Sequence, residues 1–322
     1  MPRYKIRYTL AGRLLIAAIA GTLSGCDRAI MSVMVDAPNR GRSARSTDPS
    51  AAPPLPRWLG ATEQFYVDVG PPDAKLRVWR FEPKDDADLI DGNPKGTILV
   101  IHGYRNTAFW MLINRRALAR AGYRLFFVDL RGHGKSTGDY ISYGAVESQD
   151  LVQVIDELQR RDLITGRIGV WGHSMGAATA IQLAARDPRV EAVVAVSPYT
   201  TMRDVVPHLV HKALPFSRSF IEPEKIDQLV DQAGERAGFD PDQASTLHAI
   251  QQTDTPILIM HGQWDWVVPY EHGKKLHEAA PDHTEFITLP KIGHVLADVD
   301  LGGRVDRESI AWYDRYLLDQ AP

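Results

Sequence analysis

The sequence predicts an α/β protein built on an open, doubly wound, mostly parallel sheet. Short continuous apolar runs are typical of strands buried on both faces, and helical patterns lie between these runs. Two segments of alternating polarity come first and predict leading antiparallel strands. After the sixth strand the parallel pattern stops, and helical apolar spacing at about 200–253 predicts a cap insertion.

The individual elements follow from these patterns. The alternating strands are expected at Gln64–Val69 and Leu76–Phe81, joined by a turn at Gly70-Pro71-Pro72-Asp73. Helices are expected at Val146–Leu158 and, closing the fold, at Val305–Leu318. The strands buried on both faces are expected at Thr97–Ile101, Leu125–Val128, Ile168–Val170, Val190–Val196, Ile257–Met260 and Phe286–Leu289.

Composition limits the classes of protein to consider. The chain has 322 residues, of which 44% are hydrophobic and 24% are charged, so neither general disorder nor a polytopic membrane protein is expected. A formal net charge of −3 gives no sign of nucleic-acid binding. The single cysteine excludes an intramolecular disulfide.

The N-terminus has the layout of a secretory signal. Four basic residues without an acid precede the apolar run Leu14–Ala20, which is too short for a transmembrane helix. Leu23-Ser24-Gly25-Cys26 resembles the lipobox of bacterial lipoprotein precursors, in which the cysteine becomes the lipid-bearing first residue. An ordinary cleaved signal or an uncleaved anchor is the alternative. Loss of residues 1–25 would change the formal charge from −3 to −7, so membrane contact is expected from the lipid.

These features divide the chain into three parts. Residues 1–25 are predicted to be the signal peptide, and 26–57 to be the lipidated Cys26 with a flexible tether rich in Pro, Ala, Ser and Arg. Residues 58–320 are the expected globular domain. The predicted location is the bacterial cell envelope, on the extracytoplasmic side. Asp27 resembles a retention signal that would favour the periplasmic face of the inner membrane in a Gram-negative host.

A Gly-x-Ser-x-Gly turn links a predicted strand to a helix at Gly172-His173-Ser174-Met175-Gly176. Such a turn strains the serine backbone and requires small flanking residues, which places Ser174 at the exposed tip. The pattern alone is also compatible with an ordinary glycine-rich turn. Its position at the carboxyl end of a strand, where open sheets bind their ligands, favours a nucleophile.

Other chemistry-bearing residues follow the remaining predicted strands. They are His102-Gly103-Tyr104, Asp129-Leu130-Arg131-Gly132-His133-Gly134, His261-Gly262-Gln263-Trp264-Asp265 and Gly293-His294. With the serine turn, these motifs resemble the α/β-hydrolase superfamily over roughly residues 60–318. Ser197-Pro198-Tyr199 and the insertion after it resemble the branch of serine aminopeptidases and monoglyceride lipases. The resemblance implies the α/β-hydrolase fold.

Three residues are predicted to form a catalytic triad. A serine hydroxyl needs a base, and His294 stands on a glycine-containing loop after the last strand. Asp265, after the preceding strand, is expected to orient His294 and stabilise its cation. Asp298 and Asp300 are rivals by proximity in sequence, but they are expected to begin the last helix.

The oxyanion hole is predicted to consist of the backbone N–H groups of Tyr104 and Met175. The Gly-Gly-Gly form of the first loop is absent from the sequence, so tertiary-alcohol esters are not expected substrates. Trp264 and Trp266 are either pocket wall or core. A metal site at His208 and His211 lacks a nearby third ligand, and neither a metal nor a cofactor is expected.

The sequence therefore predicts a membrane-anchored serine hydrolase that cleaves an acyl ester or thioester through an acyl-enzyme. This activity would be that of a carboxylesterase, lipase or thioesterase. An aminopeptidase or amidase uses the same triad and remains an alternative, as does a non-catalytic binding module. The expected partners are a small-molecule or lipid acyl substrate and the membrane, with no nucleic acid. The oligomeric state stays open.

Overall fold

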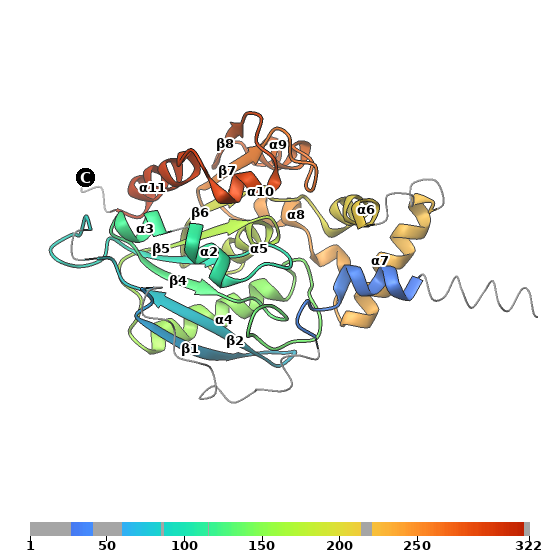
Figure 1. Ribbon diagram of the computed structural model, residues 1–322, viewed down its shortest axis with the longest axis horizontal. Helices are drawn as coiled ribbons and strands as arrows, with labels where there is room; N and C mark the ends of the chain where they lie inside the picture. Colours follow the sequence, from blue (N-terminus) through green and yellow to red (C-terminus); the bar gives the residue numbers. More distant parts are fainter. Residues whose placement is uncertain (1–26, 41–59, 85–86, 115, 214–220, 319–322) are drawn as a thin grey trace, which may run out of the picture.

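The computed structural model describes residues 27–40, 60–84, 87–114, 116–213 and 221–318. Eight strands form one sheet at the centre of the molecule (Figure 1). The strands are β1 (Glu63–Val69), β2 (Ala74–Phe81), β3 (Thr97–Ile101), β4 (Arg124–Val128), β5 (Ile168–His173), β6 (Val190–Val196), β7 (Ile257–Gly262) and β8 (Thr284–Leu289). All eight predicted strands are therefore present.

The sheet has the order β1-β2-β4-β3-β5-β6-β7-β8. β2 pairs antiparallel with both β1 and β4, and all pairs from β4 to β8 are parallel. The prediction of leading antiparallel strands on a parallel sheet is confirmed. Because β3 to β8 run in the same direction, their carboxyl ends meet at one edge, which we call the carboxyl edge.

Helices cover both faces of the sheet because the central strands are apolar on both sides. Every residue of β3 is buried, and its alternate side chains enter two separate cores. One core lies under α4 (Glu147–Arg160), α5 (Met175–Ala184), α8 (Thr246–Ile250) and α9 (Glu271–Ala279). The other lies under α2 (Ala108–Asn114), α3 (Arg116–Arg120), α10 (His294–Val299) and α11 (Arg304–Tyr316).

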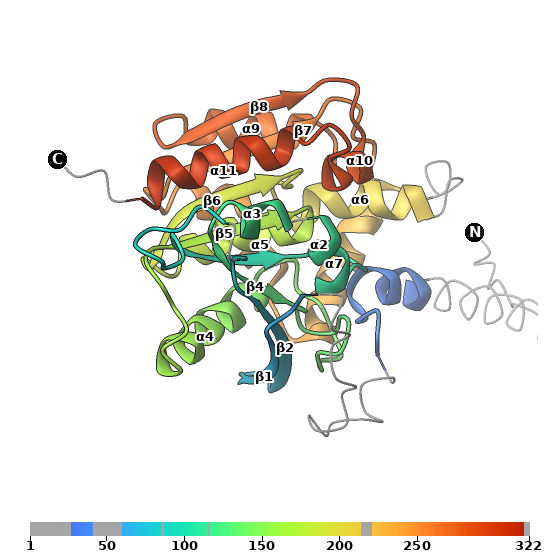
Figure 2. The same ribbon diagram turned by 60° about the vertical axis from the view of Figure 1, so that its left-hand side comes forward.

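The insertion between β6 and β7 is helical, as its apolar spacing predicts. It contains α6 (Met202–Ala213), α7 (Pro223–Ala237), the short helix η5 (Pro241–Gln243) and α8. In α7, Ile226, Leu229 and Val230 are buried on one face. In both views α6 and α7 lie beyond the carboxyl edge of the sheet (Figures 1 and 2).

The prediction of a flexible tether is wrong for residues 27–40. Residues 27–35 form a helix, and Ile30, Met34 and Val35 are buried in the larger core. Ile30 and Met34 are four residues apart and thus lie on one helix face, a spacing that the Pro- and Ser-rich average composition hides. Residues 1–26, with the predicted signal and Cys26, and residues 41–59 lie outside the described residues.

The domain binds the end of this helix through its carbonyl groups. The last carbonyls of a helix have no partner within the helix and need donors from elsewhere. Here the Tyr104 hydroxyl donates to Val33 O at 2.7 Å, and the Tyr143 hydroxyl donates to Met34 O at 2.9 Å. The Ile141 N–H donates to Val35 O at 2.9 Å. The helix is therefore an integral part of the domain.

Within the ranges given above, no helix combines the length and the apolar character that crossing a bilayer requires.

Candidate active site

Ser174 occupies a strained turn at the carboxyl end of β5. Its backbone has φ 56° and ψ −117°, and α5 begins at the next residue. A Cβ atom at Gly172 would lie 2.3 Å from Gly176 O, and one at Gly176 would lie 2.4 Å from Ile101 O. Both flanking positions therefore require glycine. Ser174 itself is 8% exposed.

Asp265, which follows β7, and His294, which follows β8, form a buried pair. His294 Nδ1 lies 2.7 Å from Asp265 Oδ2, and both side chains are largely removed from solvent. Since an aspartate carboxylate only accepts, Nδ1–H is the donor, which leaves Nε2 with a free lone pair. A histidine in this tautomer can act as a base at Nε2.

The backbone of the β7–α9 loop holds the Asp265 carboxylate in place. Oδ1 accepts the N–H groups of Val267 and Val268, each at 2.9 Å. Burial raises the pKa of Asp265, but the hydrogen bond and the charge of His294 outweigh it, and the net pKa lies below the ordinary value. The carboxylate is thus ionised at neutral pH and can stabilise a cationic His294.

The Ser174 turn and His294 meet through the residue before the serine. His173 Nε2 lies 3.2 Å from His294 O, and the two imidazole centroids are 4.6 Å apart. In the described part of the chain no hydrogen bond joins Ser174 Oγ to His294. Such bonds are often long without substrate and shorten in the reactive complex. The structure thus brings all three predicted residues to one place and links two of them directly.

The two rival aspartates have other partners. Asp298 lies within α10, where its Oδ2 accepts the Trp110 indole N–H at 2.6 Å. Asp300 ends α10 in a left-handed conformation and accepts the Asp306 N–H at 2.8 Å. Neither carboxylate has a hydrogen bond to His294 among the described residues.

The loop after β3 lies directly against the Ser174 turn. A Cβ atom at Gly103 would lie 3.3 Å from Ser174 Cβ, so the absence of a side chain allows this approach. Between the described residues, the backbone N–H groups of Tyr104 and Met175 make no hydrogen bond. Met175 is also the first residue of α5, where the helix dipole favours negative charge. This arrangement suits the predicted oxyanion hole.

Two buried histidines support this loop, a role that the sequence did not reveal. His102 Nδ1 lies 2.8 Å from Gly103 O, while its Nε2 accepts the Leu130 N–H at 3.0 Å. His133 Nε2 accepts the N–H of Arg105 at 3.3 Å. Burial lowers the pKa of both rings, that of His102 to about 3, so both are neutral acceptors. Only the topology brings these residues together.

Trp264 and Trp266 are neither core nor buried wall, because they are 61% and 66% exposed. The Lys212 ammonium of α6 stands 3.8 Å from the centroid of the Trp266 ring, in a cation–π contact between the insertion and the acid-bearing loop. Burial lowers the pKa of Lys212, and the charge of Asp265 opposes this shift. Nothing in the spacing of residues along the chain indicated this contact.

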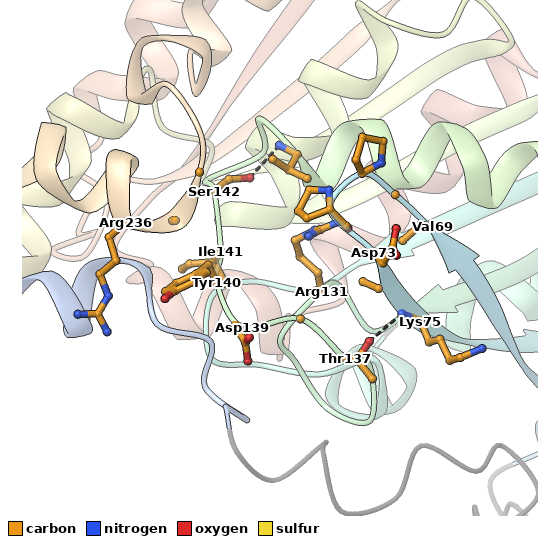
Figure 3. Close-up of a pocket in the computed structure, with 18 of the residues that line it drawn as sticks. Val69, Asp73, Lys75, Arg131, Thr137, Asp139, Tyr140, Ile141, Ser142 and Arg236 are labelled. Atoms are coloured by element: carbon orange, nitrogen blue, oxygen red, sulfur yellow. Dashed lines mark hydrogen bonds between the residues drawn. The ribbon is translucent and has the colours of Figure 1, made fainter.

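A cavity of about 1190 Å³ lies apart from the predicted site residues, between the β1–β2 turn, residues 137–146 and the end of α7. Figure 3 shows Thr137, Tyr140 and Arg236 around it, and its lining contains none of the predicted site residues. Among the described residues, no group of three or more His, Cys, Asp or Glu is placed to hold a metal ion.

Comparison with known proteins shows which sequences and structures this chain is similar to. The sequence model of the serine aminopeptidase S33 family matches residues 92–237. An esterase from Pyrococcus furiosus, Pf2001, superposes with a TM-score of 0.61 at 23% identity, over 83% of this chain and 96% of its own. Est1E from Butyrivibrio proteoclasticus, solved with ferulic acid, superposes with a TM-score of 0.58 at 20% identity, over 78% and 99%. The chain therefore has the α/β-hydrolase fold and is similar in sequence to hydrolases of the serine aminopeptidase S33 family.

Three relatives have sequences that align with two thirds or more of this chain. Human protein ABHD12B is 30% identical over 243 residues, which are 68% of this chain and 62% of that protein. The uncharacterised Escherichia coli protein YfhR is 25% identical over 258 residues, 79% of this chain and 80% of YfhR. The lysophosphatidylserine lipase ABHD12 of Gallus gallus is 26% identical over 273 residues, 78% of this chain and 67% of that enzyme.

Proposed function

We propose that the protein is a serine hydrolase that cleaves an acyl ester or thioester through an acyl-enzyme. Ser174 is the nucleophile, His294 the base and Asp265 the residue that orients it. The backbone N–H groups of Tyr104 and Met175 stabilise the oxyanion. The observation that carries the proposal is the buried Asp265–His294 pair, at 2.7 Å, beside the strained Ser174 turn. Esterases and a lysophospholipid lipase among the similar proteins support an acyl substrate.

The reaction follows from the tautomer of His294. Ser174 Oγ attacks the acyl carbon while Nε2 of His294 takes its proton, and the carbonyl oxygen gains negative charge next to the two N–H groups. The tetrahedral intermediate collapses, the bond to the leaving oxygen or sulfur breaks, and His294 returns the proton to the leaving group. Water repeats these steps on the acyl-enzyme, releasing the carboxylic acid and regenerating Ser174.

A covalent probe tests the nucleophile. The wild-type protein should react with a fluorophosphonate probe, whereas Ser174→Ala should not. Ser197→Ala is a matched control, because Ser197 also has a positive φ, is buried and directly follows a strand. Labelling of Ser174→Ala would contradict the proposal by showing that another residue is the nucleophile. A complete absence of labelling in the folded wild type would favour a non-catalytic binding module.

Aminopeptidase or amidase activity is the second candidate, favoured by the match to the serine aminopeptidase family. Nitrophenyl esters of increasing acyl length beside aminoacyl nitroanilides separate the two. Each methylene buried in an apolar pocket contributes about 0.8 kcal/mol, so two more carbons should raise kcat/KM by roughly tenfold until the pocket is filled. Faster hydrolysis of the anilides, with a flat ester profile, would support the peptidase.

We also propose that Cys26 carries lipid and holds the enzyme at the extracytoplasmic face of a bacterial membrane. The lipobox-like residues Leu23–Cys26 and the short apolar run before them support this. Two or more acyl chains on one cysteine would make release from the bilayer slow. In cells fed a clickable palmitate analogue, the wild type should be labelled and Cys26→Ser should not. Equal labelling of both, or of neither, would rule out the anchor.

A further inference from the structure

Four of the nine large apolar side chains that are exposed in the described structure flank the predicted site residues in the sequence. Two lie on either side of Asp265, two directly follow His294, and others lie on α2 and after α10. The members are Trp264 (61% exposed), Trp266 (66%), Val295 (59%), Leu296 (45%), Leu301 (84%), Phe109 (38%) and Trp110 (39%). We call this set the mouth surface.

Hydrogen bonds connect the elements that carry the mouth surface. The Trp264 N–H donates to Ile292 O at 2.9 Å, which joins the β7–α9 loop to the segment before α10. The Trp110 indole donates to Asp298 in α10, which joins α2 to the same helix. Figure 2 shows α2, α10 and α6 together on the right-hand side, where the strands end. The elements that carry the mouth surface are therefore neighbours at the carboxyl edge.

The N-terminal chain enters the described fold at this same edge. The helix of residues 27–35 also lies on the right-hand side in Figure 2. Tyr104, in the loop after β3, donates a hydrogen bond to this helix. Lys225 of α7 forms an ion pair with Asp27 at 2.7 Å. Nine helical residues span only about 13 Å at 1.5 Å each. Asp27, the residue after Cys26 in the sequence, therefore lies within about 13 Å along the helix of the carbonyls that Tyr104 and Tyr143 bind.

We propose that the mouth surface rests in the interfacial region of a lipid bilayer, so that a membrane-resident acyl lipid reaches Ser174 directly from the bilayer. This inference rests on the proposed function for its substrate, but the contact itself does not depend on catalysis. Tryptophan is the residue that settles at the headgroup level, because its ring is apolar and its N–H is polar. The acidic net charge, −3 for the full chain and −7 after loss of residues 1–25, favours neutral over anionic lipids.

A bilayer fits the mouth surface better than a second copy of the chain does. The residue just before the docked helix is the lipobox-like Cys26, and lipid on this cysteine would attach the chain to a membrane. An exposed apolar surface beside a hydrolase site also gives a poorly soluble substrate a path that avoids water. A dimer through this surface would cover Trp264, Val295 and the approach to His294.

Tryptophan quenching tests the contact independently of activity. The full chain is reconstituted with phosphatidylcholine vesicles, with and without bromine on the acyl chains. Bromolipids should quench the wild type and quench Trp264→Phe/Trp266→Phe by less than half as much. The core residues Trp171 and Trp312 are buried and should not contribute. Equal quenching of the two proteins, or no quenching together with a dimer in light scattering, would overturn the proposal.

An activity comparison tests the consequence for the substrate. Leu296→Asn/Leu301→Asn should hydrolyse a dissolved nitrophenyl ester at the wild-type rate and a vesicle-borne monoacylglycerol at least tenfold more slowly. Ile90→Asn is the matched control, because Ile90 is 47% exposed but precedes β3, at the opposite edge of the sheet. Equal loss on both substrates would contradict the proposal. If the wild type cleaves neither substrate, the proposed function fails, while quenching still decides the membrane contact.

Discussion

Ser174 and Ser197 hold equivalent places on two neighbouring parallel strands. Each directly follows its strand, has a positive φ (56° and 54°) and donates its N–H to the next strand at 2.8 Å. Both are largely or fully buried. Yet only Ser174 is the predicted nucleophile, although neither serine hydroxyl has a hydrogen-bond partner among the described residues. Strain at the carboxyl edge of the sheet is therefore not sufficient to define a site.

The surroundings of the two serines account for the difference. Ser174 is flanked by glycines, starts α5 without an intervening loop and lies beside the Gly103 backbone. Ser197 is followed by Pro198 and Tyr199, and α6 begins only at Met202. We therefore expect the close approach of the Gly103 backbone and of His294 to give Ser174, and not Ser197, its reactivity.

The largest expected effect separates the two serines directly. Ser174→Ala should lower kcat by about 10⁵ to 10⁶, because nucleophile and base act as a unit, and His294→Ala should be about equally damaging. Ser197→Ala should retain activity within a factor of about three. Nitrophenyl ester turnover measures both. If Ser197→Ala is the inactive variant, the nucleophile has been placed on the wrong strand.

The acid gives the next largest effect. Asp265→Asn should lower kcat by up to about 10⁴ with little change in KM, because the amide favours the wrong imidazole tautomer. Asp298→Asn should keep most of the activity, since its carboxylate accepts from Trp110 rather than His294. Full kinetic curves at pH 7 decide between them, and the opposite order would move the acid to α10.

Replacement of a flanking glycine tests the steric difference. In Gly176→Ala the new Cβ would meet Ile101 O at 2.4 Å and His102 O at 2.6 Å, so strand and turn must separate. We expect a loss of about 2–3 kcal/mol in the free energy of unfolding, measured by denaturant titration. Gly302→Ala, which has nothing within 4 Å, should change it by under about 0.5 kcal/mol. Equal values would show that the turn is not tightly packed.

A neutral histidine supports the backbone near each serine, which predicts a pH effect. Burial lowers the pKa of His102 to about 3 and that of His272, which accepts from Thr200, to about 4. The unfolded chain binds these protons near pH 6.5 and the folded chain does not, so stability is complete above pH 6.5 and falls as the pH decreases toward 3 to 4.

The slope for each histidine is at most about 1.4 kcal/mol per pH unit. In His102→Gln the dependence of unfolding free energy on pH between 6.5 and 4.5 should become clearly less steep than in the wild type. Chemical denaturation across this interval measures it. An unchanged slope would mean that His102 is protonated in the folded protein.

The smallest expected effect concerns the helix of residues 27–35. Tyr143→Phe removes the donor to Met34 O and leaves that carbonyl buried, which should cost about 1–2 kcal/mol. Tyr140→Phe is the control, because among the described residues its hydroxyl accepts a hydrogen bond from the exposed Arg40 side chain alone. Protease cleavage after residue 40 should become faster in the first variant only. Equal cleavage would indicate that the helix does not depend on this bond.

The sequence was sufficient for the sheet because continuous and alternating apolar runs report directly on burial. It was sufficient to propose Ser174, Asp265 and His294 because their motifs follow strands that must end at one edge. It failed for residues 27–40, where Ile30, Met34 and Val35 are few within a polar stretch and the capping tyrosines are distant in the chain. The hydrogen bond from the Arg105 N–H to His133 was missed for the same reason, because the two residues are distant in the chain and meet only in the folded protein.

The contact between Lys212 and Trp266 has a consequence for the population of conformers. It joins the first helix of the insertion to the loop that bears Asp265, at a ring that is 66% exposed. Such a pair at an exposed site contributes about 0.5–1 kcal/mol. Since RT is about 0.6 kcal/mol, it favours the joined conformer over the separated one by only about two- to fivefold. If this contact alone held α6 against the loop, the two would be separated in roughly one molecule in three to six at room temperature.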